Sequence, residues 1–543
     1  MQEITIGDYL IDRLRALGVE HIFGVPGDYV LGFYSLLEKR EVPIINTCDE
    51  QGAGFAADAY ARVRGLGVVC VTYCVGGLKI ANTTAEAYAE KSPVVIISGS
   101  PGMKERDKNP LLHHKVREFD TQFKIFEQIT AASTVLSDAQ TAQREIDRVL
   151  EAALHYKRPV YIEIPRDMVG ARCIAHHRTA ERRAESDANA LREALAEAVE
   201  LLNGAKQPVI LADVEVHRFG LQERLLRLAE QANIPIASTI LGKSVISEAH
   251  PLYLGVYEGA MGREEVRRYV EESDCALLLG VFMTDVNLGI YTARLELGRA
   301  IYATSEKLTI RYHTYENVEL PDFLDGLLGA PLKQHAPRDI PRPAAPAPFT
   351  PEKGKKISVR RLFQRCNTFL TEDVIVVADV GDSLFGAADL MIRNRTEFLG
   401  PAYYTSMGFA VPASIGAQVA SPNLRPLVLV GDGAFQMTGM ELATAVRFGL
   451  SPIVIVLNNG GYGTERPMQD GKFNDILRWN YHRLPDVLGA GRGFLVETED
   501  QLDAALAEAR QHTESYCLLD VHLDPTDRSP ALDRLTERLG KRL

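Results

Sequence analysis

The 543-residue sequence predicts an α/β protein with three doubly wound parallel-sheet domains, the first and third related to each other. Three observations support this: unbroken apolar runs, helical patterns between them (6–17 and 190–202), and a motif that occurs twice. Apolar runs without polar alternation are typical of strands covered by helices on both faces of a parallel sheet. These runs lie at 68–75, 94–98, 159–164, 208–212, 276–281, 374–378, 426–430 and 452–457.

Two stretches are predicted to be linkers between the domains. Residues 331–351 contain seven of the 27 prolines, which stiffen a chain and exclude it from helices and central strands. Residues 171–190 are charged and lack strand character. The predicted domains are therefore 1–175, 190–332 and 353–543.

The first and third domains share a motif at matching intervals. Gly27-Asp28 with Gly32 corresponds to Gly381-Asp382 with Gly386, and a Gly-Phe-Ala follows each motif 27 residues later. The same order and spacing favour an internal duplication. Two related domains on either side of a different one suggest a ligand held between the related pair.

Composition excludes several classes of protein. The net charge of −12 is dispersed, which argues against nucleic acid or an anionic membrane as the main partner. We expect no membrane span, because no apolar run approaches the required length. We also expect no signal peptide at the start of this sequence. The seven cysteines are few and scattered, as expected of reduced thiols in a cytoplasmic protein.

The strongest chemical signal is a pair of polar strand ends in the third domain. Gly431-Asp432-Gly433 follows one apolar run, and Asn458-Asn459 ends the next, with a helix predicted over 438–448. Neighbouring parallel strands end at the same sheet edge, where α/β proteins bind ligands. The Asp432 carboxylate, the Asn459 amide oxygen and the Gly461 carbonyl predict a Mg²⁺ site that phosphate oxygens complete.

Gly-Asp-Gly, 24 further residues and then Asn-Asn resemble the cofactor signature of thiamine-diphosphate enzymes. Features along nearly the whole chain are similar to the pyruvate, indolepyruvate and phenylpyruvate decarboxylases. The resemblance implies that the first domain binds the aminopyrimidine of thiamine diphosphate and the third binds its diphosphate and Mg²⁺. It also implies a homotetramer with active sites between subunits. The reaction would be non-oxidative decarboxylation of a 2-oxo acid to an aldehyde and CO₂, through the ylid and enamine of the cofactor.

The resemblance assigns further residues to the cofactor. Glu50, otherwise an ordinary acidic residue at a helix start, matches the glutamate that hydrogen-bonds the aminopyrimidine ring. Met407 matches the apolar residue that bends the cofactor, and the Thr405 carbonyl would accept from its 4′-amino group. The other predicted cofactor contacts are Asp382, Asp432, Gly433, Ala434, Asn459 and Gly461.

Four more residues are predicted to be catalytic with Glu50. They are Asp28, the adjacent His113 and His114, and Glu465, and each matches a decarboxylase position that faces the reaction centre. Taken alone they would be a turn aspartate, a surface histidine pair and a loop charge. Adjacent side chains are expected to point in different directions, so we expect no metal ion shared by the two histidines. Their separate proton-transfer roles stay open.

The resemblance places five residues around the substrate: Val286, Val380, Leu384, Thr464 and Met468. Pyruvate decarboxylases tend to have a large aromatic residue near Leu384 and a tyrosine near Val286, so this pocket is expected to prefer larger aromatic, branched or long aliphatic 2-oxo acids. A pyruvate decarboxylase and a carboligase similar to acetohydroxyacid synthases remain alternatives. A nucleotide- or flavin-binding oxidoreductase is disfavoured, because no Gly-x-Gly-x-x-Gly follows a strand.

Overall fold

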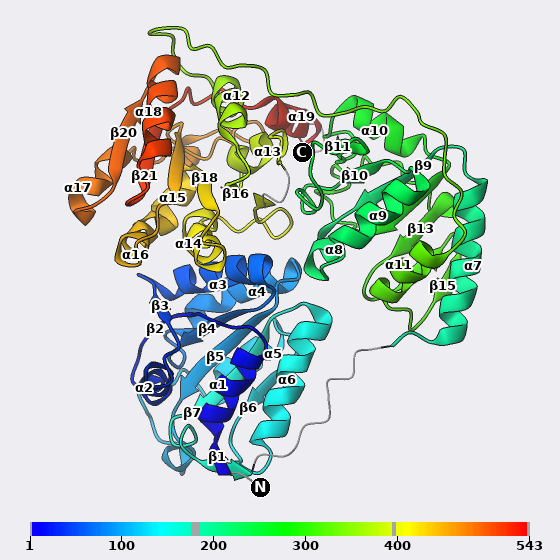
Figure 1. Ribbon diagram of the computed structural model, residues 1–543. Coiled ribbons are helices and arrows are strands. Elements are labelled where there is room, and N and C mark those ends of the chain that lie inside the picture. The colour runs from blue at the N-terminus through cyan, green and yellow to red at the C-terminus, as the bar shows by residue number, and fades with distance from the viewer. Residues whose placement is uncertain (1–2, 175–184, 394–397, 540–543) are drawn as a thin grey trace.

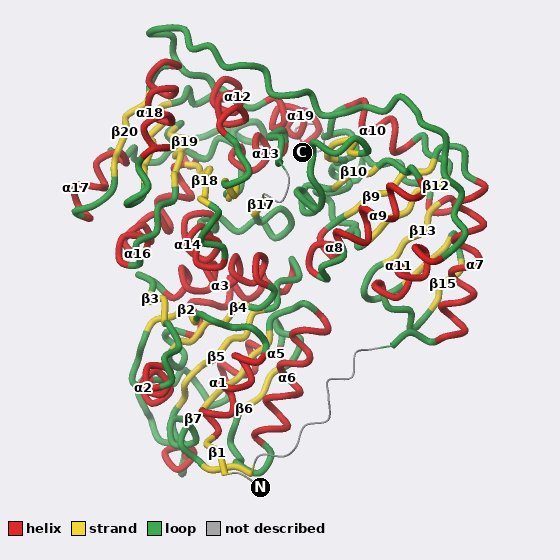
Figure 2. The backbone as a smooth tube through the Cα atoms, viewed as in Figure 1, coloured by secondary structure: helices red, strands yellow, loops and turns green. Residues whose placement is uncertain are grey.

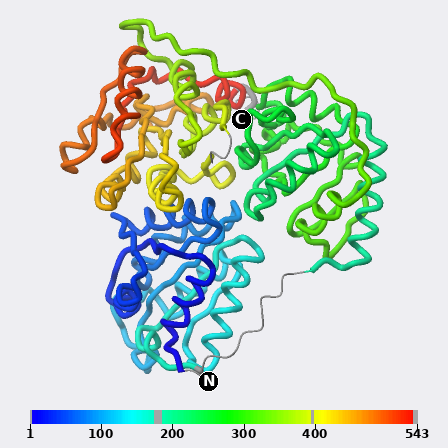
Figure 3. The backbone as a smooth tube through the Cα atoms, in the orientation of Figure 1, coloured from blue at the N-terminus to red at the C-terminus, as the bar shows by residue number. Residues whose placement is uncertain are grey.

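The computed structural model describes residues 3–174, 185–393 and 398–539, and its three sheet-and-helix bodies confirm the predicted fold class (Figure 1). In Figure 3 the first body is blue to cyan, the middle one is green, and the third is yellow to red. Among the described residues, no helix has the length and apolar character that crossing a membrane requires. All seven cysteines are free thiols, and only Cys48 is exposed.

The N-terminal body is a six-stranded parallel sheet between helices. Its strands are β2 (Ile22–Val25), β3 (Ile44–Asn46), β4 (Gly67–Val71), β5 (Val94–Ser100), β6 (Ser133–Val135) and β7 (Val160–Pro165). Its helices are α1 (Ile6–Ala16), α2 (Leu31–Lys39), α3 (Glu50–Arg64), α4 (Ala81–Ala89), α5 (Thr121–Glu127) and α6 (Ala142–Tyr156). The spatial order is β3-β2-β4-β5-β7-β6. When the six strands are numbered 1 to 6 along the chain, they lie side by side in the order 2-1-3-4-6-5.

The C-terminal body repeats this plan. Its parallel strands are β16 (Val374–Ala378), β17 (Phe398–Leu399), β18 (Arg425–Gly431), β19 (Ile453–Asn458), β20 (Arg492–Val496) and β21 (Cys517–His522). Its helices are α12 (Val359–Phe369), α13 (Asp382–Ala388), α14 (Ala410–Ala420), α15 (Asp432–Thr438), α16 (Leu442–Arg447), α17 (Leu484–Leu488), α18 (Glu499–Gln511) and α19 (Pro530–Leu539). The order β17-β16-β18-β19-β21-β20 is again 2-1-3-4-6-5, which supports the predicted duplication.

The middle body differs in its strand order and is not wholly parallel. Its strands are β9 (Pro208–Ala212), β10 (Ile236–Ser238), β11 (Tyr253–Val256), β12 (Cys275–Leu279), β13 (Ala300–Ala303), β14 (Leu308–Ile310) and β15 (His313–Tyr315). Its helices are α7 (Ala188–Gly204), α8 (Val214–Arg218), α9 (Gln222–Ala232), α10 (Glu264–Glu271) and α11 (Leu320–Gly329). The order is β11-β10-β9-β12-β13-β14-β15, and the last two strands are antiparallel. The fully parallel prediction is wrong at this edge, because three-residue strands are too short to give a pattern.

Helices α3 and α14, from the first and third bodies, pack closely against each other (Figure 1). Small residues make this contact possible: a methyl group added at Gly416 would lie 1.9 Å from the carbonyl oxygen of Ala56. Every residue of α14 is buried, as are residues 52–62 of α3. The two related bodies are therefore joined within one chain through the helix that begins at Glu50.

The two predicted linkers have different structures. Residues 331–351 contain no helix or strand and run along the surface from the middle to the C-terminal body (Figure 2). In the other stretch, β8 (Arg172–Ile174) pairs with β1 (Glu3–Thr5), so the absence of a strand there was a wrong prediction. Residues 175–184 lie outside the described residues, and α7 begins at Ala188.

Candidate active site

The predicted metal ligands lie together at the carboxyl ends of β18 and β19. These strands are parallel neighbours, with Gly431 opposite Leu457. Asp432 is almost completely buried, and its two carboxylate oxygens accept from Gly433 N at 2.8 Å and Gly460 N at 2.6 Å. Burial raises the pKa of Asp432 to about 6. A nearby cation would stabilise the ionised form of this carboxylate.

The backbone around Asp432 allows close approach of another group. Gly460 has φ +78°, and Gly461 N donates to the Asn459 side-chain oxygen at 3.2 Å. An added methyl group would lie 2.6 Å from the Tyr462 ring at Gly433 and 2.1 Å from the Asn474 carbonyl oxygen at Gly461. The glycines are therefore required in this cradle.

The predicted helix over 438–448 is wrong at its start. A helix begins six residues earlier, at Asp432, and α15 ends at Thr438. A 3₁₀ turn over 439–441 separates it from α16, and a methyl group added at Gly439 would lie 2.4 Å from the Phe435 ring. The carboxylate at Asp432 therefore stands in the first turn of a short helix.

A cavity of about 100 Å³ opens beside this cradle. Its chemistry fits a diphosphate with Mg²⁺, because carboxylate and amide oxygens lie beside glycine backbone. Tyr462 is the only aromatic residue among its described lining residues. The predicted site residues that line it are Val380, Asp382, Met407, Asp432, Gly433, Ala434, Asn459, Gly461, Thr464 and Glu465.

The segment that carries Thr405 and Met407 is held by a buried carboxylate that the sequence analysis missed. Asp379 accepts from Gly408 N at 3.0 Å and from Ala410 N at 2.8 Å. Burial raises the pKa of Asp379 to about 6. Thr405 has φ +57°, an unusual value for a β-branched residue. An acidic residue directly after the apolar run 374–378 was the available signal.

Asp382 lies on the cavity wall, but its carboxylate is already partnered. It accepts from the backbone N of Ser529 at 2.8 Å and from the Ser529 hydroxyl. Burial raises the pKa of Asp382 to about 6. Asp382 thus connects α13 to Ser529, the residue before α19.

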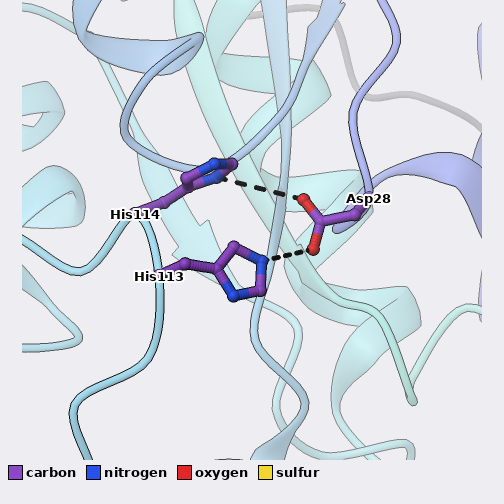
Figure 4. Close-up of side chains that lie close together, drawn as sticks. All are labelled: Asp28, His113 and His114. Atoms are coloured by element: carbon purple, nitrogen blue, oxygen red, sulfur yellow. Dashed lines mark hydrogen bonds and ion pairs between the residues drawn. The ribbon is translucent and has the colours of Figure 1, made fainter.

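Asp28, His113 and His114 form a second cluster, on the N-terminal body (Figure 4). His113 Nε2 lies 2.7 Å from one Asp28 oxygen, and His114 Nδ1 lies 3.9 Å from the other. Tyr29, which the sequence analysis missed, stacks on the His113 ring with centroids 4.9 Å apart. The side chains of Asp28 and His113 are exposed.

The expectation that adjacent histidines diverge is wrong for this pair. His114 has φ +66°, and this left-handed kink turns both rings toward Asp28 although the ring planes are nearly perpendicular. Donor atoms of the three residues lie within 4.8 Å of one another. The His113 imidazole and the Asp28 carboxylate are within hydrogen-bonding distance in this cluster.

Glu50 is the first residue of α3. Asp49 caps the helix by accepting from Gln51 N at 2.9 Å. Lys79 lies 2.8 Å from the Glu50 carboxylate. The buried Glu441 of the C-terminal body accepts from Cys48 N and Asp49 N, both at 3.0 Å. Lys79 and Glu441 are contacts that the sequence analysis missed, and Glu441 fixes the start of the helix from another domain.

Three of the predicted substrate-pocket residues do not line the cavity. Leu384 is fully buried in the C-terminal hydrophobic core, and Val286 of the middle body packs against the same core. Met468 is partly buried in the loop after β19. No described residue of the N-terminal body lines the cavity, so neither Glu50 nor the Asp28 cluster forms part of its wall.

Comparisons with known proteins identify the three bodies. Three domains of thiamine pyrophosphate enzymes match the chain: the N-terminal TPP binding domain at 4–124, the central domain at 195–314 and the C-terminal TPP binding domain at 379–521. Indole-3-pyruvate decarboxylase of Azospirillum brasilense is 38% identical over 513 residues, 93% of each chain.

Two mycobacterial relatives also match nearly the whole chain. The alpha-keto-acid decarboxylase of Mycolicibacterium paratuberculosis is 34% identical over 528 residues, 96% of this chain and 94% of the relative. That of Mycobacterium tuberculosis (strain H37Rv) is 35% identical over 535 residues, with the same coverage. The predicted resemblance is confirmed: the chain belongs to the thiamine-diphosphate-dependent 2-oxo-acid decarboxylases.

Proposed function

We propose that the protein decarboxylates 2-oxo acids with large aromatic, branched or long aliphatic side chains, and that Mg²⁺ holds the diphosphate of its cofactor. The buried Asp432 beside Asn459, on a glycine-lined cavity, is the observation that carries this proposal. Val380 and Thr464, which are small or medium-sized, line the cavity, and the Azospirillum relative is named for a large aromatic 2-oxo acid. Pyruvate is therefore expected to be a poorer substrate.

In this proposal the chain positions the reactants and moves protons. Asp432, Asn459 and the Gly461 carbonyl would bind Mg²⁺, and the Thr405 carbonyl and Met407 would orient the cofactor. Thiamine diphosphate supplies the electron sink that accepts the electrons of the bond broken as CO₂ leaves. Glu50 would share a proton with the aminopyrimidine, and Asp28 with its histidines would supply and remove protons at the substrate oxygen. Glu465, exposed on the cavity rim, would lie beside the substrate carboxylate.

We propose further that each active site is completed by a second subunit in a homotetramer. The Asp28 cluster and the Asp432 cavity lie on different bodies of one chain. Both are accompanied in sequence by exposed apolar side chains, which favour burial against a partner. Near the first these are Leu31, Val75, Leu111 and Val116, and near the second Met437, Met440, Phe473, Leu477 and Trp479.

The substrate proposal is tested by measuring aldehyde release from phenylpyruvate, indolepyruvate, 4-methyl-2-oxopentanoate and pyruvate, each with thiamine diphosphate and Mg²⁺. We expect faster turnover of the three larger acids and its loss in Glu50→Gln, while Glu38→Gln, an exposed glutamate of the same domain, retains it. Turnover of pyruvate alone would overturn the substrate preference. Acetohydroxy acid without aldehyde would favour the carboligase alternative.

The intersubunit site is tested by mixing two inactive variants, Glu50→Gln and Asp432→Asn, after reversible dissociation. In randomly mixed dimers, half would be heterodimers with one intact site each, so about a quarter of the activity returns. Sites built within single chains would regain none. Mixing Glu50→Gln with Asp28→Asn is the matched control, because both changes lie on the same half and leave no intact site.

A further inference from the structure

A second cavity, of about 430 Å³, lies between the middle and C-terminal bodies. The proline-rich linker forms part of its wall, at residues 343–347. It shares no lining residue with the cofactor cavity, and helix α13 contributes to both walls. Figure 1 shows α13 and α19 beside the middle body in this region. None of the predicted site residues lines it.

Glu258 is the unusual residue of this cavity. It is 5% exposed, and its Oε1 has no hydrogen-bond partner among the described residues. Leaving a buried acceptor unpaired is unfavourable, and more so for a charged group. Burial and the nearby Asp389 raise the pKa of Glu258 to about 7, against the effect of Arg534 and Lys243. A ligand that donates a hydrogen bond, above all a cationic one, would stabilise this carboxylate.

The same cavity also places two guanidinium groups beside one carboxylate. Arg263 and Arg534 both approach one carboxylate, Asp389, at 3.4 and 3.2 Å. Lys243 is already paired with Glu248 at 2.6 Å, and Arg534 Nε donates to the Met261 carbonyl oxygen at 2.8 Å. Two guanidinium groups on one carboxylate retain N–H donors for a second anion. A carboxylate is the small anion that matches their geometry.

The remaining walls are largely apolar. Val256, Phe363, Leu390 and Met391 contribute side chains, and the linker adds prolines and alanines. Such walls leave polar recognition to the few charged groups at Glu258 and the arginines. The volume suits one small molecule with an apolar side chain.

We propose that this cavity binds an apolar α-amino acid, with its ammonium group on Glu258 and its carboxylate on Arg263 and Arg534. Binding would be reversible, with no chemical step. The occupant would contact the start of α19, because Ser529, Pro530 and Arg534 line this cavity while Leu532 lines the cofactor cavity. Ser529 also binds Asp382 on the cofactor side. The site is therefore connected to the cofactor cavity through one helix.

The test measures binding of L-phenylalanine and L-leucine to the full-length protein free of thiamine diphosphate, by titration calorimetry and thermal unfolding. Phenethylamine lacks the carboxylate and 3-phenylpropanoate lacks the ammonium group, so each is expected to bind at least tenfold more weakly. Glu258→Gln should weaken L-phenylalanine binding at least tenfold. Glu272→Gln, an exposed glutamate directly after α10 that does not line the cavity, should leave it unchanged.

Arg263→Gln provides a second variant if Glu258→Gln does not fold, because the Arg263 side chain is 30% exposed and its pair with Asp389 is long. This variant should bind the two amino acids at least tenfold more weakly, and its binding of phenethylamine should be unchanged. Equal binding of 3-phenylpropanoate, or no binding of either amino acid at millimolar concentration, would overturn the proposal. Because binding is measured without cofactor or turnover, that failure would be distinct from a failure of the proposed decarboxylase activity.

Discussion

The first and third bodies have the same strand order, yet they present opposite kinds of site at equivalent strand ends. In the first, Asp28 follows β2, is exposed, and contacts two histidines. In the third, the matching Asp382 follows β16, is partly buried, and is bound to Ser529. The third strand of each sheet differs too, because β18 leads to the buried Asp432 and β4 leads to Thr72.

This difference shows how two copies of one sheet can carry different functional groups at equivalent strand ends. The shared strand order fixes where the strand ends lie, and individual side chains decide whether an end is open or enclosed. The N-terminal body offers exposed groups that can transfer protons, whereas the C-terminal body offers an enclosed, glycine-lined cavity. In the proposed intersubunit site each body supplies one part, and the cavity beside Asp432 accordingly has no described lining residue from the N-terminal body.

The largest expected effect is at Asp28, at the exposed strand end of the N-terminal body. Asp28→Asn should lower the decarboxylation rate about a hundredfold to ten-thousandfold, the usual contribution of acid–base catalysis. It should change thermal stability little, because the side chain is 39% exposed. Steady-state kinetics with phenylpyruvate and thermal unfolding check both parts. A stable, fully active Asp28→Asn protein would contradict the role of this cluster.

Much of the scaffold could be predicted because its strands are buried on both faces. Each of the eight apolar runs contains a strand, although the run 68–75 is a strand only to Val71, and the polar ends after 426–430 and 452–457 meet as predicted. Short strands such as β3 and β17 were missed, because two or three residues carry no periodicity.

The residues that hold the site in place could not be predicted, since they depend on contacts distant in the chain. Glu441 fixes the backbone beside Glu50 from 392 residues away. The convergence of His113 and His114 depends on one backbone angle, which residue types do not specify. The spacing of motifs in the sequence therefore identified the candidate site residues. Their positions depend on tertiary packing, which the spacing does not specify.

A buried acidic cluster between the two related bodies gives a medium effect that depends on pH. Glu86 lies 3.7 Å from Arg62, which also pairs with Asp58 and Glu90, and both Glu86 oxygens lack hydrogen-bond partners among the described residues. Burial, then Glu90 and Asp58, raise the pKa of Glu86 well above its ordinary value. The folded protein thus holds this proton at a pH where the unfolded chain has released it.

A raised carboxyl pKa stabilises the fold only while the group is protonated. The stability is present below the unfolded pKa and is lost as pH rises toward the folded pKa, by about 1.4 kcal/mol per pH unit. Glu86→Gln removes this loss. The unfolding free energy of the variant should therefore increase relative to that of the wild type as pH rises from about 5 to 8. Urea unfolding at several pH values measures the difference. For the control Glu127→Gln, at an exposed residue, the plot of unfolding free energy against pH should be parallel to that of the wild type. A parallel plot for Glu86→Gln would contradict the assignment.

The smallest effect is expected at the enclosed counterpart of Asp28. Asp382→Asn should lower the unfolding free energy by about 1 kcal/mol, because the Ser529 hydroxyl can turn and accept from the new amide while one hydrogen bond is lost. The decarboxylation rate should fall about tenfold or less, since Asp382 supports α19 through Ser529. Urea unfolding and kinetics, measured beside Asp28→Asn, separate the two aspartates. A rate loss as large as that of Asp28→Asn, at unchanged stability, would place Asp382 in the chemistry and remove the functional difference between the repeats.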